Sequence, residues 1–240
     1  MTPSPAARTF EVRHVQFARA AFAALAAIMI TFSPDHSAAV GAAVFSGFAI
    51  ATGLVWAVSL WLVYPAGQRV IPGLMALATL AAGMAGGLPP LRTIDGYFWM
   101  VILWAAATGV IELVAGVRGL RLASRADKGT LEAAHPSQEE ALAAAAAIPR
   151  SQSRDALTVG ILTLVLAAAM LLVPQTYALD YTIAEAGQSF TLTGITIGVG
   201  IFGGYAAIIA VYLAIAGFSP RPTTPAEAPA VARADQENHP

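Results

Sequence analysis

Six long apolar runs divide this sequence, and they constrain its fold more than any other feature. A helix needs about 20 mostly apolar residues in succession to cross the hydrocarbon core of a bilayer. The runs lie at residues 20–32, 38–63, 70–88, 97–117, 156–173 and 190–218. We therefore predict an all-α membrane protein with six transmembrane helices.

The composition supports a membrane protein and excludes several other classes. Hydrophobic residues make up 57% of the 240 residues, and charged residues make up 11%, against roughly 25% in an average soluble domain. A formal net charge of -1 argues against a nucleic-acid partner, because proteins that bind nucleic acids usually have a basic surface. The absence of cysteine excludes disulfides, thiolate metal sites and cysteine nucleophiles. We expect no metal and no cofactor.

The first run is short, and two interpretations of it stay open. Arg13 and Arg19 precede it, as basic residues precede the apolar stretch of a cleaved signal peptide. We favour a retained transmembrane helix, because Val15 and Phe17 extend the run. In that interpretation the side chain of Arg19 reaches to the lipid headgroups.

The distribution of basic residues predicts the orientation. Twelve of the 13 Lys and Arg residues fall on one side of the predicted helices, and only Arg92 falls on the other. The twelve are Arg8, Arg13, Arg19, Arg69, Arg118, Arg121, Arg125, Lys128, Arg150, Arg154, Arg221 and Arg233. Basic residues gather in cytoplasmic loops, so both termini and the long loop are expected in the cytoplasm.

These positions divide the chain into five segments. They are a cytoplasmic segment at 1–14, four helices at 15–117, a cytoplasmic loop at 118–154, two helices at 155–218 and a disordered tail at 219–240. Within the loop, Ser137 and Glu140 form a capping-box pattern that predicts a short helix at 141–147. The loop is either a solvated linker, which we favour, or a regulatory or partner-binding element.

Small residues four apart recur on the even-numbered helices and indicate an internal repeat. The pairs are Ala49 and Gly53, Ala105 and Gly109, and Gly200 and Gly204. Residues four apart share one face of a helix, and small side chains there let another helix approach closely. We therefore predict three repeated helical hairpins with a packing seam on each even-numbered helix. The seams join helices within one chain or, as the alternative, between chains of a homo-oligomer.

The fourth helix carries a more specific pattern. Residues 104–118 read WAAATGVIELVAGVR, with a tryptophan, small residues, a glycine, an isoleucine–glutamate pair and a basic exit. This segment resembles the signature of the HdeD-like family, short-repeat bacterial membrane proteins linked by name to acid resistance. The resemblance implies six helices, a bacterial inner membrane and a role in acid or envelope stress. It implies no known reaction.

Glu112 is the one acidic residue inside a predicted span. An ionisable residue within the membrane is costly and is a functional candidate by default. One hypothesis is that Glu112 takes up or passes a proton. The other, which we favour, is a packing anchor that is hydrogen-bonded to Thr108, to Thr52 or to a basic side chain.

Three functions follow from these patterns. The first is a non-enzymatic membrane protein that contributes to acid or envelope stress resistance. The second is a small proton-coupled transporter or channel that uses Glu112, and polar residues converging within the bundle would favour it. The third is a lipid-acting enzyme, for which the sequence shows no catalytic pair. The lipid bilayer is the expected partner, with a homo-oligomer or other membrane proteins as further partners.

Overall fold

The computed structural model describes residues 10–132, 150–183 and 187–219, and in these it forms a bundle of six long helices. They are α1 (Val12–Thr31), α2 (Ala38–Leu62), α3 (Val70–Gly87), α4 (Ile94–Glu132), α6 (Arg150–Leu172) and α7 (Gly194–Phe218). Short 3₁₀ helices, η1 (Ala66–Gln68) and η2 (Pro89–Leu91), lie before α3 and α4. Each long helix is long and apolar enough to cross a membrane. The prediction of a polytopic membrane protein with six spans is confirmed, and the short first run forms part of the helix α1.

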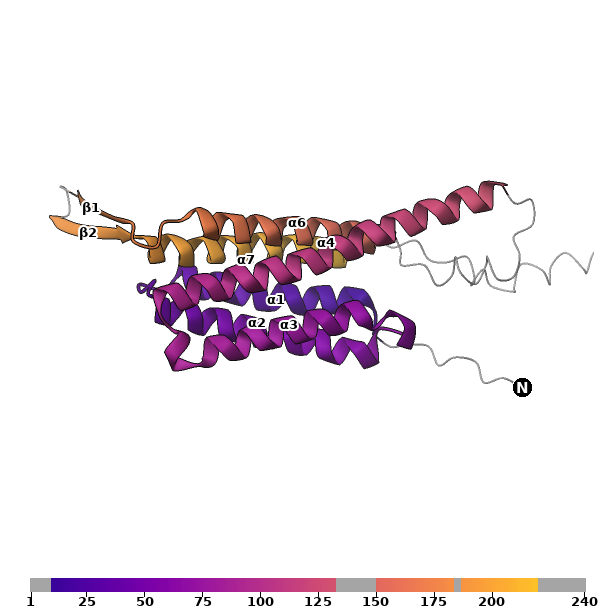
Figure 1. Cartoon of the computed structure of the whole chain (residues 1–240), viewed down its shortest axis with the longest axis horizontal. Helices are drawn as coiled ribbons and strands as arrows, with labels where there is room; N and C mark the ends of the chain where they lie inside the picture. Colours follow the sequence, from indigo (N-terminus) through magenta and orange to yellow (C-terminus); the bar gives the residue numbers. More distant parts are fainter. Residues whose placement is uncertain (1–9, 133–149, 184–186, 220–240) are drawn as a thin grey trace, which may run out of the picture.

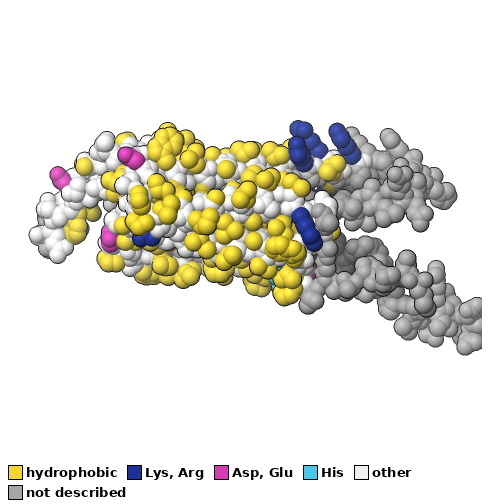
Figure 2. All heavy atoms as spheres, turned by 60° about the horizontal axis from the view of Figure 1, so that its bottom comes forward, with side chains coloured by type: hydrophobic (Ala, Val, Ile, Leu, Met, Phe, Trp, Pro, Cys, Tyr) yellow, Lys and Arg dark blue, Asp and Glu magenta, His cyan; other side chains and the backbone are white. Residues whose placement is uncertain are grey.

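The two ends of the bundle differ in charge. The helices α1, α3 and α6 begin at one end, which we call the basic end because arginines of α4 and α6 lie there; α2, α4 and α7 begin at the other. Figure 2 shows several basic side chains at one end and the visible acidic ones at the opposite end, where one basic side chain also lies. Apolar side chains cover the surface between them, as expected for contact with lipid.

A β-hairpin marks the second end, which we call the hairpin end (Figure 1). Strands β1 (Ala178–Ile183) and β2 (Gln188–Thr193) pair antiparallel, and Gly187 adopts a positive φ of 58° at the turn. The prediction that the last helix includes Phe190 is wrong, because Phe190 belongs to β2 and stacks on Tyr181 across the ladder. The helix begins at Gly194, and Thr193 caps it by accepting a hydrogen bond from the Thr196 backbone N–H.

The fourth helix is longer than expected. It does not end at Val117 but continues as α4 to Glu132, so residues 118–132 of the predicted loop are helical. Figure 1 shows this segment projecting beyond the bundle at the basic end. Leucine, arginine, alanine and lysine, which dominate the extension, are strong helix formers. The capping-box pattern at Ser137 and the short helix at 141–147 lie outside the described residues, as does the tail from residue 220.

The helices pack most extensively in three pairs, namely α2 with α3, α4 with α6, and α1 with α7. The successive helices of the predicted hairpins, α1/α2, α3/α4 and α6/α7, also contact one another, but less extensively. The hairpin repeat therefore stays a prediction, and these contacts are consistent with it. The tightest contacts run between the hairpins, and one of them joins the first helix to the last.

Glycines form the seams of these pairs. A Cβ atom on Gly53 of α2 would lie 2.7 Å from Leu80 Cγ of α3, and one on Gly109 of α4 would lie 2.8 Å from Leu164 Cγ of α6. Ala49 and Ala105 are fully buried one turn earlier. These contacts join helices of one chain.

The seam of the last helix is one residue out of the expected register. Gly200 and Gly204 are exposed, with nothing within 4 Å of a Cβ atom placed there. The neighbouring Gly203 faces inward instead, where a Cβ atom would lie 2.7 Å from Ile30 Cγ2 of α1. A shift of one residue turns a helical position by about 100°, which is enough to exchange a buried face for an exposed one.

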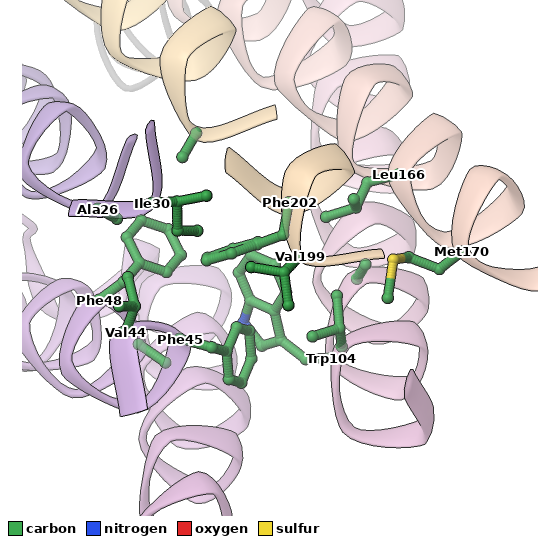
Figure 3. Close-up of a cluster of buried hydrophobic side chains, with 14 of the residues drawn as sticks. Ala26, Ile30, Val44, Phe45, Phe48, Trp104, Leu166, Met170, Val199 and Phe202 are labelled. Carbon is green, nitrogen blue, oxygen red and sulfur yellow. The ribbon is translucent and has the colours of Figure 1, made fainter. Parts of the chain in front are cut away.

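An aromatic cluster closes the bundle between its centre and the hairpin end. Phe45 and Phe48 of α2 meet Trp104 of α4 and Phe202 of α7, with ring centroids 5.3 to 5.7 Å apart and edge-to-face geometry. Figure 3 shows these four side chains converging from three helices. Edge-to-face packing is a favoured arrangement of aromatic side chains and is worth about 0.5–1.5 kcal/mol per pair.

Candidate functional site

A buried ion pair lies in the half of the bundle nearer the basic end. Arg19 of α1 donates from Nη2 to Glu112 Oε1 of α4 at 2.9 Å. The Arg19 and Glu112 side chains keep only 12% and 6% of their surface exposed. Removing two charges from water costs several kcal/mol per ion, and short contact between them offsets that cost. The expectation that Arg19 reaches the headgroups is wrong, because its side chain turns inward to Glu112.

Trp56 of α2 completes the environment of Arg19. The Arg19 guanidinium carbon lies 4.6 Å from the centroid of the Trp56 ring, a cation–π contact that strengthens when it is desolvated. Arg19 therefore joins α1 to both α2 and α4. The Arg19 Nε and Trp56 Nε1 donors have no acceptor among the described residues.

A cavity of about 270 Å³ leads to this pair. All six long helices line it. At its mouth lie the first turns of α1, α3 and α6, including Val12, Val70 and Gln152, all at the basic end. Arg19, Trp56 and Glu112 line its walls further along the helices, and most of the remaining wall is apolar. The cavity therefore connects the basic end with the ion pair.

A second polar cluster, centred on a carboxylate, lies on the same wall of the cavity. Asp155 of α6 accepts hydrogen bonds from Gln16 Nε2 of α1 at 2.8 Å and from the Tyr212 hydroxyl of α7 at 3.2 Å. The apolar run of the fifth span starts at residue 156, and the sequence predicted no role for Asp155. The three residues tie α1, α6 and α7 together beside the cavity.

Hydroxyl groups converge deeper in the bundle, between the ion pair and the aromatic cluster. Thr163 of α6 bonds the Tyr205 hydroxyl of α7 at 2.9 Å, and the indole N–H of Trp104 lies 3.4 Å from Thr79 Oγ1 of α3. With Arg19, Glu112, Thr52 and Thr108 these residues surround a void of about 10 Å³, which is close to the space that one water molecule needs. The core is thus polar around Glu112 and apolar beyond it.

The two predicted hydrogen-bond partners of Glu112 have other roles. Thr108 lies on the same face of α4, but its hydroxyl donates to the backbone carbonyl of Trp104 at 2.7 Å. Thr52 is buried, and its hydroxyl has no hydrogen-bond partner in the described part of the chain. Of the three hydrogen-bond partners predicted for Glu112, the structure shows the basic side chain, which is that of Arg19.

Residues 104–118 of the fourth helix combine several structural roles. Trp104 belongs to the aromatic cluster, Gly109 lies at the seam with α6, Glu112 is in the ion pair, and Arg118 lies at the basic end. These positions span one helix, so they follow from a single local pattern. Arg19 and Trp56, which complete the site, belong to other helices.

In comparisons with known proteins, no family model, no curated protein and no solved structure matches this chain.

Proposed function

We propose that this polytopic membrane protein is a non-enzymatic, acid-responsive protein of the inner membrane, in which Glu112 takes up a proton from the cytoplasm. The basic end faces the cytoplasm in this proposal, in accord with the positive-inside rule. The observation that carries it is the buried Arg19–Glu112 pair at the end of a cavity leading from the basic end. The HdeD-like signature around Glu112 points to the same kind of function.

Protonation of Glu112 would change the structure because it removes the countercharge of Arg19. A neutral carboxyl group no longer holds a guanidinium by charge, and an uncompensated buried charge costs free energy. Arg19 would then turn away from Glu112, and α1 would lose its charged link to α4. A local proton-binding event is in this way coupled to the arrangement of two helices, as in other electrostatic switches.

The cavity supplies the route for the proton, and the aromatic cluster closes the other side. Phe45, Trp104 and Phe202 separate the polar core from the hairpin end. Glu112 would therefore respond to the pH at the basic end. Acidification of the cytoplasm, rather than of the outside, would be the signal.

Infrared difference spectroscopy tests the proposal directly. The purified protein in lipid nanodiscs is compared between neutral and mildly acidic pH, and the carbonyl band of a newly protonated carboxyl group is sought. We expect a band in the wild type that is absent from Glu112→Gln. Asp155→Asn is the matched control, because it removes the neighbouring carboxylate and should keep the Glu112 band. A band lost only in Asp155→Asn would overturn the assignment.

A second candidate function is a small proton-coupled transporter. The convergence of threonine hydroxyls with Glu112 and Tyr205 in the core favours it. This function requires the aromatic cluster to open toward the hairpin end in a second conformation. Reconstituted vesicles with an internal pH indicator distinguish the two functions, since a transporter dissipates a proton gradient when its substrate is added and a sensor does not.

A further inference from the structure

The cavity has the composition of a small-molecule site. Its volume of about 270 Å³ is slightly below the roughly 300–1,000 Å³ of pockets that hold drug-sized ligands. Val15, Ile71, Met75 and Val159 are among the apolar residues that form most of its wall, and a few polar groups interrupt it. A wall of this kind selects a compact molecule with an apolar body and one polar group.

The polar groups of the wall favour an anion. Arg19 Nε and the Trp56 indole N–H are buried donors without an acceptor in the described residues, and Trp56 as a whole is only 8% exposed. Buried donors are normally paired, and a ligand oxygen would pair them. The first turns of α1, α3 and α6 also meet at the mouth, where helix N-termini carry partial positive charge.

Glu112 decides when an anion can bind. In its ionised form it occupies Arg19 and repels a second carboxylate. Once it is protonated, Arg19 is released and can rotate into the cavity. We propose that the cavity then binds a small monocarboxylate, with the apolar body in the cavity and the carboxylate held by Arg19 and the Trp56 N–H. The release step rests on the proton uptake proposed above, and the anion replaces Glu112 as the countercharge of Arg19.

The other titratable groups around the cavity belong to the connection before α3 and to α6 and α7. Asp155 of α6 carries a second negative charge, but it accepts hydrogen bonds from Gln16 and Tyr212. Tyr64 of the connection lines the wall, and Tyr205 of α7 lies by the deeper void. Because Asp155 is acidic, an organic cation is the alternative ligand. The experiment below distinguishes the anion from the cation.

Isothermal titration of the nanodisc-embedded full chain with hexanoate and hexylammonium, which share an apolar body and differ in charge, tests the proposal. We expect hexanoate to bind at mildly acidic pH and more weakly at neutral pH, and hexylammonium not to bind. Glu112→Gln, which imitates the protonated residue, should bind hexanoate at both pH values. Equal binding of the two compounds, preference for hexylammonium, or no binding of hexanoate to either protein would overturn the proposal.

Trp56→Phe isolates the indole N–H while it keeps an aromatic ring beneath Arg19. Loss of one hydrogen bond to a charged carboxylate should weaken hexanoate binding roughly tenfold to a hundredfold. Trp61→Phe is the matched control, because Trp61 lies on the exposed surface of α2 and should leave the affinity unchanged. Palmitate tests a membrane fatty acid as the source of the carboxylate, and tighter binding of palmitate than of hexanoate would overturn the assignment to a small ligand.

The ligand and the proton proposals fail separately. If Glu112 shows its carbonyl band on acidification but hexanoate does not bind, only the ligand proposal is wrong. If hexanoate binds with no dependence on pH and Glu112 shows no band, the site exists and the proposed proton response is wrong.

Discussion

Gln16 Nε2 donates a 2.8 Å hydrogen bond to Asp155 Oδ2, which ties α1 to α6 beside the cavity. Hydrogen bonds to charged groups contribute about 1.5–3 kcal/mol, so Gln16→Leu should lower the free energy of unfolding by a similar amount. Reversible unfolding in mixed detergent micelles measures the change. Gln188→Leu on exposed β2 is the control and should have little effect. Equal effects of the two substitutions would show that the bond does not hold the helices.

The Arg19–Glu112 pair should behave as one unit in a double-mutant cycle. Breaking a buried pair by removing one partner costs about 3–5 kcal/mol, so Arg19→Gln and Glu112→Gln should each be strongly destabilising. The double variant should lose much less than the sum of both, since no charge then remains unpaired. Unfolding free energies provide the measurement. Arg13→Gln, which removes an exposed pair with Glu11, should change stability by less than about 1 kcal/mol. Additive losses would contradict the coupling.

The glycine seams predict opposite results for two glycines. Gly109→Leu should destabilise the bundle, because the new side chain would collide with Leu164 of α6; overpacking typically costs about 1–3 kcal/mol. Gly200→Leu adds the same side chain where nothing lies within 4 Å and should be tolerated. Thermal unfolding of both variants in one detergent compares them. A stable Gly109→Leu protein would mean that α4 and α6 separate easily.

Survival at low pH tests the proposed physiological role. Deletion of the gene should reduce survival, and the wild type should restore it. Glu112→Gln imitates the protonated residue, so at equal membrane levels it should restore survival at low pH. Arg19→Gln removes the group that protonation releases and should fail to restore it. Membrane levels of each variant are measured in parallel. Unchanged survival after deletion would contradict the acid-stress role, while full rescue by Arg19→Gln would contradict a role for the ion pair in it.

The orientation can be measured with single cysteines, because the chain has none of its own. Ser189→Cys on β2 and Ser151→Cys at the start of α6 are both exposed and lie at opposite ends of the bundle. With the basic end in the cytoplasm, a membrane-impermeant maleimide should label only Ser189→Cys in cells with a permeabilised outer membrane. Ser151→Cys should be labelled only after lysis. The reverse pattern would place the basic end outside.

Hydropathy predicts the number of spans because each helix must individually satisfy the apolar bilayer. The same signal misplaces their ends. Phe190 was assigned to a helix because β2 is followed directly by the apolar residues of α7. The alternation of polar and apolar residues in 178–183 and 188–193, with Gly187 between them, was the available signal for the hairpin.

The site was only partly predictable. Glu112 stands out locally, since it is charged within an apolar run. Arg19 lies 93 residues away, and no local pattern indicates which charge meets which. For the same reason, the sequence could not show which glycine of the last helix faces inward. Gly203 and Gly204 are adjacent and equally small, and the contact with Ile30 distinguishes them.

The close pairing of α1 with α7 has a consequence for biosynthesis. The rings of Phe17 and Phe218 meet at 4.7 Å between centroids, at the basic end of both helices. Chains emerge from the ribosome in order, and their N-terminal parts are the first available for folding. Helix α1 must therefore wait in the membrane without α7, its most extensive packing partner, until α7 has been translated. Translation of α7 completes the bundle, and a chain released before it would leave Arg19 on a helix without its main packing partner.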